Sequence, residues 1–116
     1  MGLLKSFVYA FRGLALMRHS QRNFKIHLLA MLISISAAFY WPLSGTERAI
    51  IIIMVALVLS AEIFNTAIEK LCDLIDTEYN PAIGQIKDLA AAAVLILAMA
   101  SLVVAFIIFW PYLSLL

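Results

Sequence analysis

The sequence has little charge, a single cysteine and no glycine-rich phosphate loop. Only 13% of its 116 residues are charged, about half the share of about 25% that is usual in soluble proteins. The lone Cys72 excludes an internal disulfide, and no Cys/His spacing indicates zinc or redox chemistry. Neither a Walker A loop nor a kinase-type glycine loop is present. The net charge of +1 gives no reason to expect nucleic acid binding.

What the sequence has instead is long apolar runs, since 66% of its residues are hydrophobic. A bilayer core about 30 Å thick is crossed by a helix of roughly 17–25 mostly apolar residues. Three segments meet that need, residues 26–43, 48–72 and 86–110. We therefore predict an all-α integral membrane protein with three transmembrane helices, in one domain that covers residues 1–116.

Residues 1–24 have a different pattern, in which apolar residues recur at helical spacing between basic ones. This pattern is typical of an amphipathic helix on the membrane surface, with a cytosolic helix packed on protein as the alternative. Five basic residues precede the first span, and Lys70 and Lys87 flank the second connection. The positive-inside rule therefore predicts a cytoplasmic N-terminus and an external C-terminus. We expect no cleaved signal peptide.

Polar side chains align along one face of the second predicted span. The aligned residues, called here the polar face, are Glu62, Asn65, Glu69, Asp73 and Asp76. At 3.6 residues per turn they stay within a stripe about 80° wide. Glu62 lies 14 residues after Arg48, or about 20 Å into the bilayer from its outer side. A carboxylate there costs about 2.5–3.5 kcal/mol on insertion scales, so we expect it to have a function rather than only to hold helices together.

The third predicted span begins with Lys87 and Asp88, followed by Leu89 and four alanines. Small residues let helices approach closely in a membrane, so Lys87 and Asp88 are expected at the cytoplasmic mouth of the polar face. Carboxylates, an amide and a lysine near that interface suit phosphoryl transfer. This chemistry requires oxygen ligands for Mg²⁺, a cation for the phosphoryl group and a base for the attacking hydroxyl.

A non-enzymatic membrane protein is the competing interpretation, for example an ion-coupled transporter in which Glu62 and Glu69 relay protons or cations. A transporter needs polar residues that continue to the outer leaflet. Residues 49–61 and 94–109 contain only Ser60 and Ser101 as hydroxyl groups. The polar face therefore opens on one side of the membrane, which favours an enzyme.

Two segments, AEIFNTAIEKLCD and IKDLAAAAVL, resemble the signature of the prokaryotic diacylglycerol kinase family, which includes undecaprenol kinases of Gram-positive bacteria. The resemblance covers nearly the whole chain, including FVYAFRGL and RNFKIH, and RNFKIH looks closer to the undecaprenol kinase branch. It implies a kinase of the bacterial inner membrane that uses ATP and Mg²⁺. The implied acceptor is a membrane lipid alcohol, diacylglycerol or undecaprenol, and the implied assembly is a homotrimer with active sites shared between neighbouring subunits.

The resemblance also implies a role for individual residues. Glu62 matches the catalytic carboxylate, Glu69 a Mg²⁺ ligand and Asn65 a polar residue of the same centre. The positions that match nucleotide contacts are Tyr9, Glu78, Tyr79, Asn80, Lys87 and Asp88, with Lys87 on phosphate.

One position departs from the family pattern. Gln21 stands where the family usually has a second metal-binding glutamate. Its amide oxygen can ligate Mg²⁺ but brings no charge, which leaves an inactive structural relative as a further alternative. His27 is interpreted as an interfacial or packing residue rather than a catalytic one.

Overall fold

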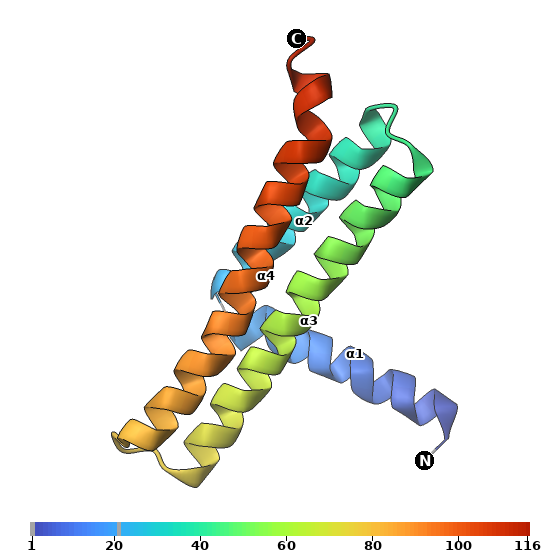
Figure 1. The fold of residues 1–116 in the computed structure, drawn as a ribbon. Helices are drawn as coiled ribbons and strands as arrows, with labels where there is room; N and C mark the ends of the chain where they lie inside the picture. The colour runs from blue at the N-terminus through green and yellow to red at the C-terminus, as the bar shows by residue number, and fades with distance from the viewer. Residues whose placement is uncertain (1, 21) are drawn as a thin grey trace.

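Four helices make up the computed structural model, which describes residues 2–20 and 22–116 and the side chains of residues 2–17 and 24–116. The helices are α1 (Leu3–Ser20), α2 (Arg22–Tyr40), α3 (Gly45–Ile75) and α4 (Pro81–Leu113). The bundle is formed by α2, α3 and α4, and α1 leaves it at a steep angle (Figure 1). The predicted all-α fold is confirmed.

The ends of the two long helices follow local capping signals. At the start of α3, the Ser44 hydroxyl accepts a hydrogen bond from the Glu47 backbone N–H, and the Glu47 carboxylate accepts one from the Ser44 N–H. Asn80 caps α4 through the Ala82 N–H, and Pro81 occupies the first turn. With 31 and 33 residues, α3 and α4 extend beyond the predicted spans 48–72 and 86–110.

Within the part of the chain that the structure describes, two helices, α3 and α4, are long and apolar enough to cross a membrane by length and composition. The apolar part of α2, Phe24–Tyr40, is shorter. Its 17 residues reach about 26 Å, somewhat less than the bilayer core of about 30 Å. A third crossing by this helix stays a prediction.

The chain buries little of its own apolar surface. Its accessible surface is 8522 Å², whereas a soluble monomer of 12.9 kDa exposes about 6,300 Å². Large apolar side chains on α3 and α4 point outward, and Leu74 and Leu102 are 85% and 71% exposed. A surface of this kind has to be covered by lipid or by another protein chain.

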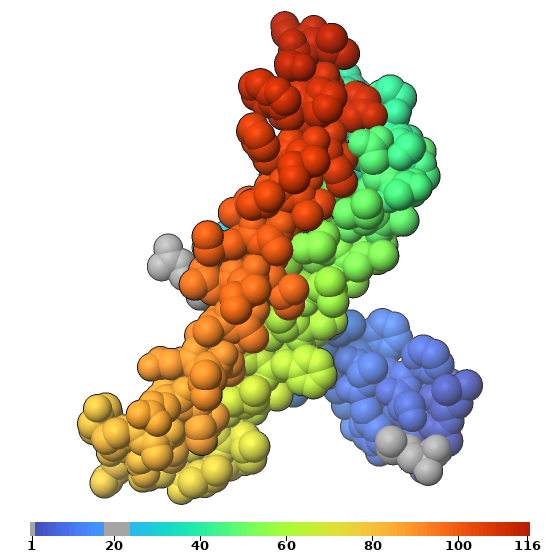
Figure 2. Space-filling view, viewed as in Figure 1, coloured from blue at the N-terminus to red at the C-terminus, as the bar shows by residue number. Residues whose placement is uncertain are grey.

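The bundle is closed at the end that carries the α2–α3 connection. An apolar core forms there from Ala38, Leu43, Ile51, Ile108 and Phe109. Arg48 Nε donates to the Ala38 carbonyl at 2.9 Å, and the Tyr112 hydroxyl donates to the Glu47 carboxylate at 3.2 Å. The polar face of α3 lies toward the opposite end, where the α3–α4 hairpin and α1 diverge (Figure 2).

Candidate functional site

Exposure increases along α3 from Glu62 to Asp73, whereas Asp76, the last residue of the polar face, is half-buried. Glu62 is buried at 5% exposure, Glu69 is half-buried and Asp73 is exposed. In Figure 1, α3 and α4 continue past the corner between α1 and α2. Glu62 contacts the beginning of α2, so it lies at the level of this corner, and the later acids lie beyond it.

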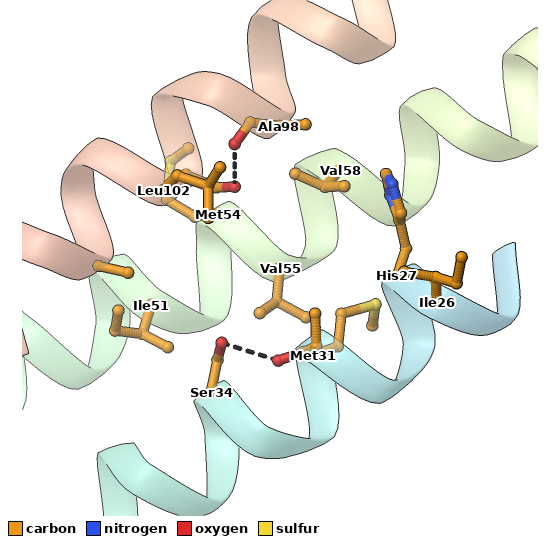
Figure 3. A pocket seen from close by; sticks show the side chains of 13 residues that line it. Ile26, His27, Met31, Ser34, Ile51, Met54, Val55, Val58, Ala98 and Leu102 are labelled. Atoms are coloured by element: carbon orange, nitrogen blue, oxygen red, sulfur yellow. Dashed lines mark hydrogen bonds between the residues drawn. The ribbon is translucent and has the colours of Figure 1, made fainter. Parts of the chain in front are cut away.

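Glu62 is paired with a histidine from the neighbouring helix. The Nδ1 atom of His27 lies 3.1 Å from Oε1 of Glu62, and Figure 3 shows the imidazole rising from α2 toward α3. This is the distance of an ion pair, but the alignment is not that of a hydrogen bond, and Nδ1 is buried with no other partner among the described residues. The interpretation of His27 as a packing residue therefore misses its contact with the predicted catalytic carboxylate.

Glu69 and Asn65 form the next part of the site, one turn apart on α3. The Asn65 amide nitrogen donates to Oε1 of Glu69 at 3.2 Å. The Asn65 carbonyl oxygen Oδ1 is buried and accepts no hydrogen bond within the described part of the chain. Amide and carboxylate oxygens are the ligands that Mg²⁺ prefers, and protein sites often supply only one or two of them beside substrate phosphates. The donors present therefore fit this ion.

The described residues contain no group of three or more His, Cys, Asp or Glu side chains close enough to hold a metal ion. Gln21, the second predicted ligand, lies outside the described residues. The pairing of Glu69 with Gln21 around a metal therefore stays a prediction.

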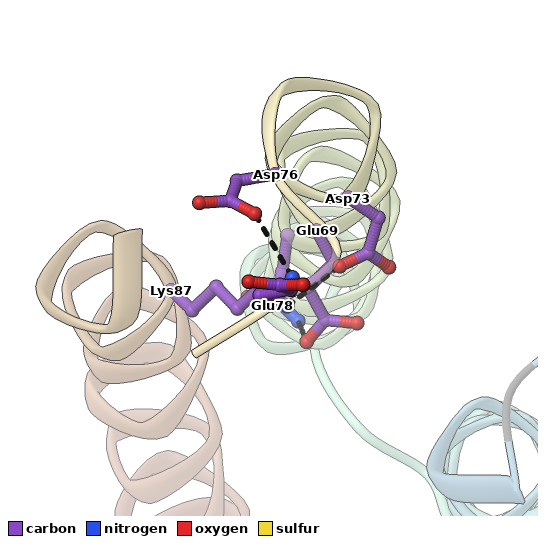
Figure 4. A network of polar contacts seen from close by, with 6 residues as sticks. Glu69, Asp73, Asp76, Glu78 and Lys87 are labelled. Carbon is purple, nitrogen blue, oxygen red and sulfur yellow. Dashed lines mark hydrogen bonds and ion pairs between the residues drawn. The ribbon is translucent and has the colours of Figure 1, made fainter. Parts of the chain in front are cut away.

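Lys87 joins the site from α4. Its Nζ atom lies 2.8 Å from Oδ1 of Asp73, and the two side chains are 38% and 61% exposed. Figure 4 shows Lys87 extending from α4 toward the side of α3 that carries Glu69 and Asp73. The structure thus brings the predicted phosphate-binding lysine to the polar face, held there by a solvated ion pair.

The other predicted nucleotide contacts are spread over the connection and α1. The Glu78 backbone N–H donates to Oδ1 of Asp76 at 2.9 Å, Asn80 caps α4 and the Tyr79 ring is 91% exposed. Asp88 is exposed one position after Lys87. Tyr9 contacts the Arg12 guanidinium within α1, at 5.6 Å from the ring centre, and α1 packs mainly on α2. A role in nucleotide binding stays a prediction for all of them.

Among the described residues, two cavities have walls formed in part by α3. One of about 270 Å³ lies between α2, α3 and α4, is partly open to the surroundings and has His27 in its wall (Figure 3). Its two serines donate to carbonyls of their own helices, at 2.8 Å for Ser34 and 2.7 Å for Ser101, so its interior is mostly apolar. The other is lined by Asn65 together with the alanines 90 and 93, which places the alanine run beside the polar face as predicted.

Two residues that contact the predicted site, Asp73 and His27, were assigned no binding or catalytic role from the sequence. Asp73 belongs to the polar face but was not assigned to a substrate, and its spacing of four residues from Glu69 is the signal that places it near Lys87. No sequence signal identifies His27, because its contact depends on how α2 packs against α3.

The family resemblance implies that Lys87 binds a phosphate of ATP, so replacing its ion-pair partner Asp73 by asparagine should release Lys87 for that phosphate. We expect the KM for ATP to fall by at most about fivefold, the range that exposed ion pairs usually carry, with kcat nearly unchanged. The measurement is the KM for ATP at saturating lipid acceptor. Asp76→Asn removes the same charge from a carboxylate that accepts a backbone N–H instead, and serves as the control. A rise in KM, or equal effects of both substitutions, would contradict the role of Asp73.

Comparison with known proteins gives consistent matches over most of the chain. The family model described as prokaryotic diacylglycerol kinase matches residues 8–109. An undecaprenol kinase of Bacillus subtilis (strain 168) is 38% identical over 107 residues, which cover 92% of this chain and 87% of the relative. A diacylglycerol kinase of Escherichia coli (strain K12) is 30% identical over 110 residues, covering 95% and 90%. One from Synechocystis is 37% identical over 103 residues, covering 88% of this chain and 59% of the relative.

Proposed function

The chain belongs to the prokaryotic diacylglycerol kinase family and is a lipid kinase, and we propose that it transfers the γ-phosphoryl group of ATP to a membrane lipid alcohol. The transfer takes place at the cytoplasmic interface of a bacterial inner membrane. In this proposal α2, α3 and α4 all cross the bilayer, α1 lies on its surface, and the N-terminus is cytoplasmic.

The observation that carries the proposal is the order of exposure along α3. A lipid hydroxyl is confined near the membrane surface, whereas ATP arrives from the cytosol. The buried Glu62 lies at the level of the α1–α2 corner, and Glu69, Asp73 and Lys87 lie further toward the hairpin. One helix therefore supports a base at the depth of the alcohol and polar groups at the depth of the phosphates.

In the proposed reaction Glu62 accepts the proton of the lipid hydroxyl. The hydroxyl oxygen forms a bond to the γ-phosphorus as the bond from that phosphorus to the bridging oxygen of ADP breaks, and ADP leaves with the electron pair. The lipid becomes a phosphate monoester, and the proton passes from Glu62 to solvent. A positioned base of this kind typically contributes a factor of about 10²–10⁴ to the rate.

The groups beyond Glu62 bind and orient the donor. Lys87 exchanges its ion pair with Asp73 for a phosphate oxygen, and Asn65 and Glu69 offer oxygen ligands to Mg²⁺. The bound ion would offset the negative charge of the phosphates. Gln21 is the proposed second ligand, and Tyr9, Glu78, Tyr79, Asn80 and Asp88 are the proposed further nucleotide contacts.

A homotrimer is the proposed assembly. Three thin helices leave most of the apolar surface of α3 and α4 uncovered, and the polar face is partly open in the single chain. A neighbouring subunit that covers this side would exclude water from the site, which strengthens its electrostatic interactions. Shared active sites follow from such an arrangement.

Phosphorylation of a lipid by the purified protein tests the proposed function. Detergent-solubilised protein is incubated with ATP labelled in its γ-phosphate, Mg²⁺, and either diacylglycerol or undecaprenol. We expect labelled lipid phosphate with at least one alcohol, and the ratio of kcat/KM values identifies the preferred acceptor. Absence of labelled lipid with both alcohols, while ATP is intact or is hydrolysed to inorganic phosphate, would contradict the proposal.

A further inference from the structure

The geometry points to His27 as a positioning residue that fixes the carboxylate of Glu62 for catalysis. The inference rests on the proposed function, because it concerns the orientation of the proposed base. It begins from the distance of 3.1 Å between Nδ1 of His27 and Oε1 of Glu62. This contact joins α2 to α3 at the depth where the lipid hydroxyl has to be received.

Among the described residues, the imidazole of His27 makes a polar contact with the Glu62 carboxylate, and Thr66, one turn later on α3, has a buried hydroxyl with no hydrogen-bond partner. Glu62 is 5% exposed, and Val58, one turn earlier, lines the mostly apolar cavity shared with His27. A glutamate has three side-chain torsions, and the last of them is only weakly restricted. Without the contact to His27 the two carboxylate oxygens would be less restricted in direction, and a misplacement of about 1 Å can cost about a hundredfold in rate.

His27 has the properties needed to restrict this motion. Its Nδ1 atom is buried, and Oε1 of the Glu62 carboxylate lies 3.1 Å from it. The second imidazole torsion is broad, so rotation of the ring can bring an N–H at Nδ1 into line with Oε1 at this distance. The contact then occupies Oε1 and leaves Oε2 to accept the proton of the alcohol.

The cavity strengthens this assignment. It extends from His27 between α2, α3 and α4. The hydroxyls of Ser34 and Ser101 in its wall donate hydrogen bonds to backbone carbonyls of their own helices. His27 lines this cavity (Figure 3) and also contacts Glu62. In a mostly apolar environment a charge-assisted contact is screened less than at the surface, so this one contact can determine the carboxylate orientation.

Substitutions at His27 separate positioning from packing. His27→Leu removes both ring nitrogens, whereas His27→Asn keeps an amide nitrogen near the place of Nδ1. We expect the leucine variant to lose about 10- to 100-fold in kcat, with the KM for ATP changed less than about twofold, and the asparagine variant to retain most of the activity. Ser34→Ala in the same cavity is the control, and should leave kcat unchanged. Melting temperatures in detergent establish that the variants are folded.

Two results would overturn the role of His27. One is a leucine variant with the kcat of the wild type, and the other is equal loss in folded leucine and asparagine variants. If the leucine variant does not fold, His27→Gln replaces it, because its amide nitrogen reaches the place of Nε2 instead. The asparagine variant should then be the more active, and equal activities would contradict the inference. A wild type inactive on both alcohols would contradict the proposed function and this inference together.

Discussion

Replacing Glu62 by glutamine should lower the kcat for lipid phosphorylation by about 10²–10⁴-fold, the usual contribution of a positioned general base. The amide has nearly the shape of the carboxylate, so the burial of the residue at 5% exposure is preserved. What is lost is the ability to take up the proton of the lipid hydroxyl. The measurement is the single-turnover rate of label transfer from ATP to the lipid alcohol, with ATP affinity determined separately by equilibrium binding.

Glu47→Gln is the matched control for this substitution. It makes the same chemical change on the same helix, at the end where Glu47 caps α3 and contacts Tyr112. Glutamine also supports a capping box, so the control should retain wild-type turnover. A Glu62→Gln protein that phosphorylates lipid as fast as this control would remove Glu62 from the mechanism.

Replacing Glu69 by glutamine should produce the second large effect, a changed dependence on Mg²⁺. The substitution removes the negative charge of the proposed Mg²⁺ ligand, whose carboxylate accepts a hydrogen bond from Asn65. We expect the Mg²⁺ concentration for half-maximal activity to rise by at least about tenfold, a loss that even outer-shell partners of metal ligands can cause. The kcat at saturating Mg²⁺ should also be lower, because an amide oxygen holds the ion with less charge.

A Mg²⁺ titration at constant free ATP measures this effect, with Mn²⁺ binding followed by electron paramagnetic resonance as a readout that does not require turnover. Glu62→Gln is the useful comparison, since it should reduce turnover while the Mg²⁺ requirement stays close to that of the wild type. If both glutamine variants show the wild-type requirement, Glu69 is not a ligand of the ion.

The two substitutions examine different depths of one helix. Glu62 lies where α3 contacts the start of α2, and Glu69 lies two turns nearer the hairpin. We expect Glu62→Gln to lower turnover without changing the Mg²⁺ requirement, and Glu69→Gln mainly to raise the Mg²⁺ requirement. This pair of results would match an alcohol bound at the depth of Glu62 and phosphates bound at the depth of Glu69. Equal profiles at both positions would indicate a site in which acceptor and donor are not separated along α3.

Much of the molecule could be predicted from the order of its residues. Apolar runs and their breaks determine helices, because a backbone in a bilayer has to satisfy its own hydrogen bonds. The capping signals at Ser44 and Asn80 are local and act through neighbouring residues. The alignment of Glu62, Asn65 and Glu69 follows from the helical period alone, so a polar face was predictable without tertiary information.

Contacts between helices were decided only in the tertiary structure. His27 meets Glu62 across 35 positions of sequence, and this pairing depends on the rotation and depth of α2 against α3. Lys87 was expected near the polar face, but its pairing with Asp73 depends on the register of α4. The helical period determines which side chains share a face of one helix, and it can be read directly from a single sequence. Packing determines which face of a neighbouring helix these side chains contact. It depends on the sum of many weak contacts, which a single sequence does not show directly.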